Sequence, residues 1–208
     1  LVHLACISND SSFLLDENLS TSINLNAFEP MVLAAKKMNI KRFIYASTSS
    51  VYGLSDKKDV TEEHPLVPIT LYNKYKAMCE PILFKHTDEN FTGVVFRPAT
   101  VCGFSKRQRL DLSVNILTNH AFNTGIIRVV GGDQMRPNLN IIDYLRVVEL
   151  LINIDPSKIQ NEIFNVGYQN LKIKEIATLV QGVILDKYKK KTSIIFEKSD
   201  DNRSYHIN

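Results

Sequence analysis

Short apolar runs alternate along the chain with longer segments whose apolar residues recur at helical spacing. The first pattern is typical of buried strands and the second of amphipathic helices. Strands are predicted over 1–7, 41–47, 91–98, 162–166 and 193–197, with a strand–turn–strand segment over 126–144. Helices are predicted over 21–38, 72–86, about 111–123, 143–153 and about 172–185. Alternating strands and helices indicate an α/β fold with a mainly parallel sheet.

Candidate chemistry lies where the predicted strand 41–47 ends. Its last residue opens a hydroxyl cluster, Ser47-Thr48-Ser49-Ser50, and the helix 72–86 begins some two dozen residues later with Tyr72 and Lys76 on one face. Tyrosine is a poor base because its pKa is about 10, but a nearby ammonium favours the phenolate and lowers that pKa. A second hydroxyl can hold a substrate oxygen during proton transfer. The arrangement predicts removal of a proton from an alcohol.

The Tyr-x-x-x-Lys spacing is weak evidence when it stands alone. A second copy, Tyr168 and Lys172, follows the strand-like run EIFNVG and is interpreted as a surface tyrosine near a helix start. Tyr75 competes with Tyr72 on the same helix, but Cys79 occupies the position where its lysine would lie. The upstream hydroxyl cluster therefore selects Tyr72.

Composition narrows the class of protein. Apolar residues make up 44% and charged residues 23% of 208 residues, which is ordinary for a globular domain. A net charge of +3 without a basic patch does not favour nucleic acid, and no apolar run reaches membrane-spanning length. The cysteines, Cys6, Cys79 and Cys102, are few and far apart, which predicts buried thiols in a reducing cytoplasm, with no disulfide framework and no metal site.

Three motifs together resemble a known family. The chain opens with LVHLA, carries ASTSSVYG from Ala46 to Gly53, and carries YNKYK from Tyr72 to Lys76. These resemble the extended short-chain dehydrogenase/reductase family, in its NAD-dependent nucleotide-sugar epimerase/dehydratase branch. The resemblance implies Thr48, Tyr72 and Lys76 as catalytic residues and NAD as cofactor. It implies the following cofactor-binding residues: Ala5, Cys6, Ile7, Ser47, Tyr72, Lys76, Pro98 and Ala99.

The resemblance also implies the domain organisation. Residues 1–97 with about 138–166 are expected to form a partial NAD-binding Rossmann domain that lacks its first βαβ portion. Residues 98–137 with 167–208 are expected to form a smaller C-terminal substrate-binding lobe. That first portion supplies the glycine-rich pyrophosphate loop of Rossmann folds, and no such loop occurs among these residues. The chain is therefore expected to be a piece of a longer enzyme and to bind NAD poorly by itself.

Substrate-binding residues follow from the same resemblance. They are Thr48, Ser49, Thr100, Asp111, Leu112, Arg136 and Arg203. Arg136 and Arg203 match diphosphate-binding arginines, a role that suits the guanidinium fork. Asp111 and Leu112 match a pair at a helix start, where either backbone amides bind the diphosphate or Asp111 is only an N-cap. Thr100 replaces the usual asparagine.

The hydroxyl cluster favours one reaction of the branch. Dehydratases carry Asp-Glu where this chain has Ser49 and Ser50, and hydroxyls do not suit the elimination of water. The resemblance therefore implies epimerisation of a nucleotide-diphosphate sugar through a transient 4-keto intermediate. A reductase or decarboxylase of the same family, or a non-catalytic sugar-nucleotide-binding fragment, stays open. A homodimer through the helices 21–38 and 72–86 is expected; the sugar, the nucleotide and the inverted carbon are not specified.

Overall fold

The computed structural model describes residues 1–55, 57, 59–198, 204 and 206–208. They form two compact units, which are described separately below. Unit 1 contains Leu1–Pro98, Leu145–Val166 and Asn208, and unit 2 contains Ala99–Tyr144 and Gly167–Ile207. Arg203, a predicted substrate residue, lies outside the described residues.

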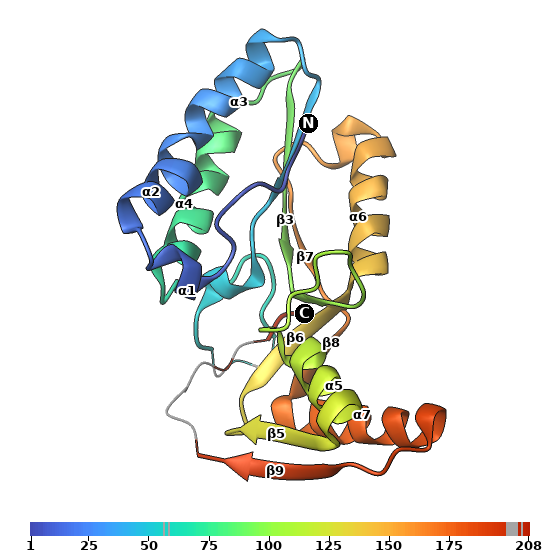
Figure 1. The fold of residues 1–208 in the computed structure, drawn as a ribbon. Helices are drawn as coiled ribbons and strands as arrows, with labels where there is room; N and C mark the ends of the chain where they lie inside the picture. The colour runs from blue at the N-terminus through green and yellow to red at the C-terminus, as the bar shows by residue number, and fades with distance from the viewer. Residues whose placement is uncertain (56, 58, 199–203, 205) are drawn as a thin grey trace. The chain divides into compact units, whose positions relative to one another are not determined.

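Unit 1 is built on a four-stranded parallel sheet in the order β1-β2-β3-β7 (Figure 1). The strands are β1 (Val2–His3), β2 (Arg42–Ala46), β3 (Thr92–Pro98) and β7 (Ile163–Val166). β2 and β3 are almost completely buried, as expected for central strands covered on both faces. The predicted α/β class with a mainly parallel sheet is confirmed.

Two long helices, α3 (Phe28–Lys37) and α4 (Leu71–Lys85), cover one face of this sheet, and α6 (Ile141–Asn153) runs along the other (Figure 1). The core between the sheet and α3 and α4 is rich in aromatic side chains. It contains Phe28, Val32, Ala35, Phe43, Tyr45, Cys79, Leu83, Phe91 and Val95. The three buried aromatics Phe28, Phe43 and Tyr45 surround His3 of β1 at ring-centroid distances of 5.6, 6.0 and 5.8 Å.

The N-terminal strand is shorter than predicted. The sequence predicts a strand over 1–7, but only Val2 and His3 pair with β2. Beyond them the Asn24 side chain takes the place of a neighbouring strand, because its Oδ1 accepts from the Ile7 N–H at 2.9 Å and its Nδ2 donates to the Ile7 carbonyl at 3.0 Å. The segment that carries Ala5, Cys6 and Ile7 is therefore held by a side-chain amide.

Where the sequence predicts one helix over 21–38, residues 10–37 form four separate helical elements. These are α1 (Asp10–Phe13), α2 (Glu17–Thr21), the π-helical η1 (Ser22–Asn26) and α3. Asn9 and Asp16 start the first two by accepting the backbone N–H groups of Ser12 and Leu19. Pro30 lies in the first turn of α3, where a missing N–H removes no helical hydrogen bond.

The remaining elements of unit 1 are short 3₁₀ turns. η2 (Ser49–Tyr52) follows β2, and η3 (Pro156–Lys158) lies between α6 and β7. η2 contains two of the predicted hydroxyl residues, Ser49 and Ser50, so the cluster leaves the strand directly into a tight turn.

Unit 2 contains two small sheets and two helices. β4 (Thr100–Cys102), β6 (Met135–Asn140) and β8 (Gln169–Lys172) form a three-stranded sheet, and β5 (Ile126–Val130) pairs in parallel with β9 (Ser193–Glu197). α5 (Ser113–Thr124) and α7 (Ile173–Tyr188) pack on β5 around Leu117, Ile127, Val129, Ile176 and Val180. In the parts of the chain that the structure describes, no helix combines the length and apolar character needed to cross a bilayer.

His3 predicts a pH-dependent loss of stability. Burial, and secondarily the charge of Lys76, lowers the pKa of His3 from 6.5 to about 4. Because the unfolded chain binds this proton more readily, stability is fully present above pH 6.5 and falls as the pH is lowered toward 4, by at most about 3 kcal/mol. Urea unfolding of the wild type and of His3→Gln at a series of pH values measures the difference. A wild-type slope equal to that of His3→Gln between pH 6.5 and 4 would contradict this assignment.

Candidate active site

Helix α4 presents three polar side chains at intervals of one turn. Its N-cap, Thr70, accepts the backbone N–H of Asn73 at 3.3 Å, which fixes the helix start just before Tyr72. Tyr72, Lys76 and Glu80 are then four residues apart and lie along one side of the helix. Lys76 and Glu80 are only 5% and 2% exposed, so this side of α4 is turned into unit 1.

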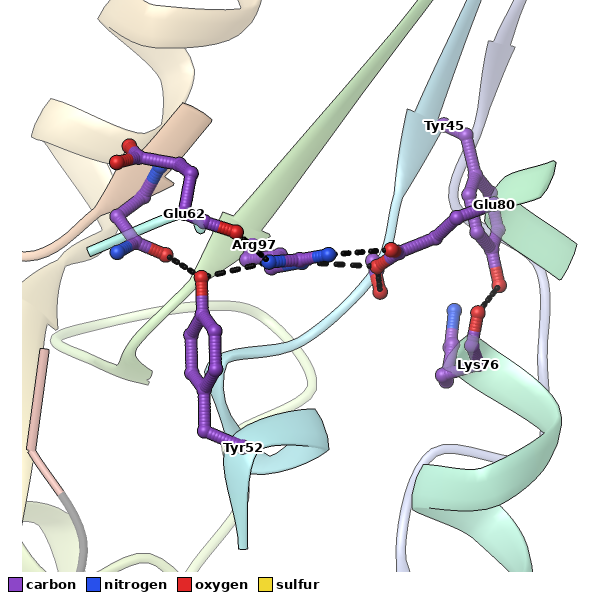
Figure 2. Close-up of polar contacts among 8 residues, drawn as sticks. Tyr45, Tyr52, Glu62, Lys76, Glu80 and Arg97 are labelled. Carbon is purple, nitrogen blue, oxygen red and sulfur yellow. Dashed lines mark hydrogen bonds and ion pairs between the residues drawn. The ribbon is translucent and has the colours of Figure 1, made fainter. Parts of the chain in front are cut away.

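Lys76 reaches the carboxyl end of β2. Its Nζ donates to the Ala46 carbonyl at 2.7 Å and lies 4.9 Å from the centre of the Tyr45 ring. The Tyr45 hydroxyl in turn donates to the Lys76 carbonyl at 3.4 Å (Figure 2). Burial raises the pKa of Tyr45 well above its usual value, so this ring stays neutral. The ammonium of Lys76 is thus bonded to Ala46, which lies two residues before Thr48 in the chain. Lys76 itself follows Tyr72 by one helical turn.

Thr48 begins a chain of hydrogen bonds that ends at Asn73, the residue after Tyr72. Thr48 Oγ1 and Ser50 Oγ are 2.8 Å apart, and Ser50 Oγ donates to Asn73 Oδ1 at 2.6 Å. A hydroxyl has one proton; since Ser50 gives its proton to Asn73, Thr48 must donate to Ser50. The lone pairs of Thr48 Oγ1 accept the Ser50 N–H at 3.3 Å and can accept from a further donor.

The sequence interpretation missed a buried polar network behind these residues (Figure 2). Glu80 and Arg97 form a two-pronged ion pair, with Nε–Oε1 at 3.0 Å and Nη2–Oε2 at 2.6 Å. Each side chain of this pair is 3% exposed. Glu80 also accepts the Ser47 hydroxyl at 2.6 Å. The only sequence signal was a glutamate one turn after Lys76 on the same helix face.

Arg97 extends this network to a loop and to β7. Its Nη1 donates to the Tyr52 hydroxyl at 2.7 Å and to the Glu62 carbonyl at 3.1 Å, and the Tyr52 hydroxyl donates to Asn165 Oδ1 at 2.7 Å. Burial acts to lower the pKa of Arg97, but the hydrogen bonds and charge of Glu80 outweigh it, and the pKa is raised. Arg97 is therefore a permanent cation, and its charge is paired with Glu80.

The predicted cofactor residues of unit 1 occupy the carboxyl ends of parallel strands. Ala5, Cys6 and Ile7 follow β1, Ser47 follows β2, and Pro98 ends β3. Open parallel sheets bind nucleotides at this edge, and lysine, tyrosine and hydroxyl side chains are donors that suit ribose and carboxamide oxygens. The strand ends of unit 1 therefore have the position and the neighbouring donors that a nucleotide cofactor requires. Ser47 is the least available of them, because it is 4% exposed and its proton goes to Glu80.

The remaining substrate candidates are divided between buried and surface positions. Ser49 in unit 1 is 2% exposed. In unit 2, Thr100 lies in β4, and Arg136 in β6 donates to the Met135 carbonyl at 2.9 Å. Leu112 is the N-cap residue of α5, with no side-chain cap bond, and Asp111 forms an exposed ion pair with Arg109. The alternative that Asp111 is the N-cap is therefore wrong, because the helix starts one residue too late for it.

The second Tyr-x-x-x-Lys pair does not form a comparable site. Tyr168 is 76% exposed, and Lys172 lies at the end of β8, 3.4 Å from Asp133. Tyr75, the competitor on α4, accepts a hydrogen bond from Thr21 at 3.3 Å. Among these tyrosines, Tyr72 alone has a buried lysine one turn further along its helix.

The Glu80–Arg97 pair predicts a large effect on stability. Glu80→Ala leaves the Arg97 guanidinium buried without a counter-charge and is expected to lower the free energy of unfolding by about 3–5 kcal/mol. Glu29→Ala is the matched control, because Glu29 pairs with Lys85 and His86 near the surface of the same unit. Its urea midpoint is expected to stay close to that of the wild type. Equal losses in the two variants would show that the buried pair has no special role.

Known proteins resemble this chain in sequence. The model of the family described as "NAD dependent epimerase/dehydratase family" matches residues 1–167. UDP-glucose 4-epimerase of Lactobacillus helveticus is 26% identical over 180 residues, which cover 77% of this chain and 54% of that protein. The chain therefore spans about half the length of this curated relative.

Solved structures share the fold at lower identity. MoeE5 in complex with UDP-glucuronic acid and NAD superposes with a TM-score of 0.81 at 19% identity. The match covers 100% of this chain and 69% of the MoeE5 chain. DesIV, a dTDP-glucose 4,6-dehydratase from Streptomyces venezuelae with NAD and TYD bound, superposes with a TM-score of 0.80 at 18% identity. The match covers 100% of this chain and 63% of the DesIV chain. The match of the family model over most of the chain decides membership: the chain belongs to the NAD-dependent epimerase/dehydratase family.

Proposed function

We propose that the protein epimerises a nucleotide-diphosphate sugar through a transient 4-keto intermediate, with Tyr72 as the base. The observation that carries this proposal is the position of Lys76. Its ammonium is held on the Ala46 carbonyl at 2.7 Å, next to the hydroxyl segment and one turn from Tyr72. A fixed cation at this place favours the phenolate form of a neighbouring tyrosine.

The residues of unit 1 divide the proton chemistry among them. Tyr72, as phenolate, takes the proton from the sugar 4-hydroxyl, and Thr48 turns its hydroxyl from Ser50 to donate a hydrogen bond to the reacting oxygen. Bound NAD supplies the acceptor for the hydride of that carbon and the donor that returns it. After the keto sugar has turned over, Tyr72 gives the proton back to the oxygen on the inverted carbon. Because the hydride that leaves the sugar returns to it, this reaction consumes no cofactor.

The cofactor is proposed to lie along the strand ends of unit 1. Ala5, Cys6 and Ile7 contact its ribose and pyrophosphate side, and Pro98 and Ala99 line the nicotinamide. Lys76 binds the nicotinamide ribose in addition to acting on Tyr72. The support is the placement of Ala5, Cys6, Ile7 and Pro98 at one edge of the parallel sheet of unit 1.

The nucleotide-sugar diphosphate is proposed to bind to residues of unit 2. Arg136 and Arg203 pair with the diphosphate, and the backbone amides at Leu112, at the start of α5, provide a helix N-terminus for the same anion. Thr100 and Asp111 complete the substrate candidates. UDP-glucose as substrate of the Lactobacillus helveticus relative supports a nucleotide sugar as the class of substrate.

Epimerisation is preferred to dehydration because of the hydroxyl segment. Ser49 and Ser50 stand where dehydratases of this branch carry an acid and a base. Ser49 is buried, and Ser50 is engaged with Thr48 and Asn73. Removal of water requires a group that protonates the leaving hydroxyl, and a serine hydroxyl is too weak an acid for this step.

We also propose that the protein forms a homodimer and that it is located in the cytoplasm. The segment 21–38 and α4 carry exposed apolar side chains in Ile23, Leu33, Met38 and Met78, as a helix-mediated subunit interface requires. Cys6, Cys79 and Cys102 are all free thiols, which suits a reducing compartment.

Tyr72→Phe tests the proposed reaction. In the full-length protein this change is expected to lower kcat at least about a hundredfold, because the base is lost, and to leave sugar-nucleotide binding nearly unchanged. Turnover of UDP- and dTDP-hexoses is followed by NMR and binding by calorimetry. Tyr75→Phe, which removes a hydroxyl from the next turn of the same helix, is expected to keep kcat within about twofold of wild type. Unchanged turnover in Tyr72→Phe would rule out the proposed base.

A further inference from the structure

Glu80 contributes both to the polar side of α4 and to the buried ion pair with Arg97. It follows Tyr72 and Lys76 at intervals of four residues along one side of α4. It also closes the buried ion pair with Arg97 at the end of β3 (Figure 2). The proposed reaction assigns it no chemical step. A buried carboxylate is costly to maintain, so its presence one turn from the proposed catalytic pair calls for an explanation.

The hydrogen bond between Ser47 and Glu80 explains why a carboxylate is buried here. Its Oε1 accepts the Ser47 hydroxyl at 2.6 Å, and Ser47 directly precedes Thr48. One turn earlier on the same helix, Lys76 donates to the carbonyl of Ala46 at 2.7 Å. Two consecutive residues at the end of β2 are therefore bonded by two side chains of α4. The helix that carries Tyr72 thus also holds the segment that carries Thr48.

Arg97 fixes the orientation of Glu80 in this arrangement. Its two parallel hydrogen bonds leave the carboxylate no freedom to rotate, and Arg97 is itself held by the Tyr52 hydroxyl and the Glu62 carbonyl. A carboxylate that is ionised can only accept, so the Ser47 proton must point at Glu80.

We propose that Glu80 is a positioning residue, which fixes the place of Thr48 relative to Tyr72 through the hydroxyl of Ser47. The proposal rests on the proposed function, because it assigns Thr48 and Tyr72 to the same reacting oxygen. It also changes the role of Ser47, whose hydroxyl serves the protein framework and not NAD. Displacement of a catalytic group by about 1 Å can cost a hundredfold in rate, so a single hydrogen bond at this place has a measurable effect.

Ser47→Ala in the full-length protein tests the link without disturbing the ion pair. It is expected to lower kcat about ten- to a hundredfold, with KM for the sugar nucleotide within about twofold and an unchanged amount of NAD bound per subunit. Ser20→Ala is the matched control, because Ser20 is 1% exposed and its hydroxyl donates to the Phe13 carbonyl at 2.9 Å in the same unit. It removes an equally buried hydroxyl away from the site and is expected to keep wild-type kcat.

Three results would overturn the proposal. Equal kcat values in Ser47→Ala and the wild type would show that the backbone bond from Ser47 N to the Phe96 carbonyl, at 2.9 Å, suffices to place Thr48. Equal losses of kcat in Ser47→Ala and Ser20→Ala would show a general effect of stability. Loss of bound NAD in Ser47→Ala would make Ser47 a cofactor ligand instead.

Hydrogen exchange separates failure of this proposal from failure of the proposed function. Amide exchange over residues 47–53 is expected to rise at least about tenfold in Ser47→Ala and to stay at the wild-type rate in Ser20→Ala, whatever reaction the protein catalyses. Wild-type exchange over 47–53 in Ser47→Ala contradicts the positioning role even if Tyr72→Phe is inactive. Raised exchange in a protein that epimerises no sugar nucleotide keeps the Ser47–Glu80 link and rejects the proposed reaction.

Discussion

The buried ion pair between Glu80 and Arg97 is the constraint on which the ordering of unit 1 depends. Two opposite charges that are each 3% exposed can stay in the interior only as a pair with well-formed hydrogen bonds. Meeting this requirement brings α4 to the end of β3 and draws in Ser47, Tyr52 and the loop at Glu62. The pair therefore sets the spacing between the helix and the strand ends where the proposed chemistry takes place.

Around this pair, the side chains of α4 have distinct tasks. Lys76 and Glu80 hold the end of β2, and Asn73 holds Ser50 and, through it, Thr48. Asn73 and Lys76, which follow Tyr72 on α4, are thereby bonded to the segment that carries Thr48. This preorganisation is what proton transfer between a substrate hydroxyl and a tyrosine requires, since the groups must meet at hydrogen-bonding distance.

Much of the fold could be predicted from sequence, because buried parallel strands and amphipathic helices have clear periodicities. The strand 41–47 and the helix 72–86 were predicted to within about a residue of β2 and α4. The Glu80–Arg97 pair could not be predicted, because nothing local shows that a helix residue and a strand residue 17 positions apart will meet. The strand over 1–7 was overestimated for a similar reason: apolar residues there are held by the distant Asn24 side chain.

In the proposed reaction, a carbon of the sugar is oxidised and reduced again within one binding event. A panel of UDP- and dTDP-hexoses that carry deuterium at carbon 4, incubated with the full-length protein, tests it most directly. The account predicts that at least one is converted to its epimer with the deuterium kept on carbon 4, because the same hydride returns to the carbon it left. Deuterium lost to solvent, a product lighter by one water, or no epimer from any member of the panel would contradict it.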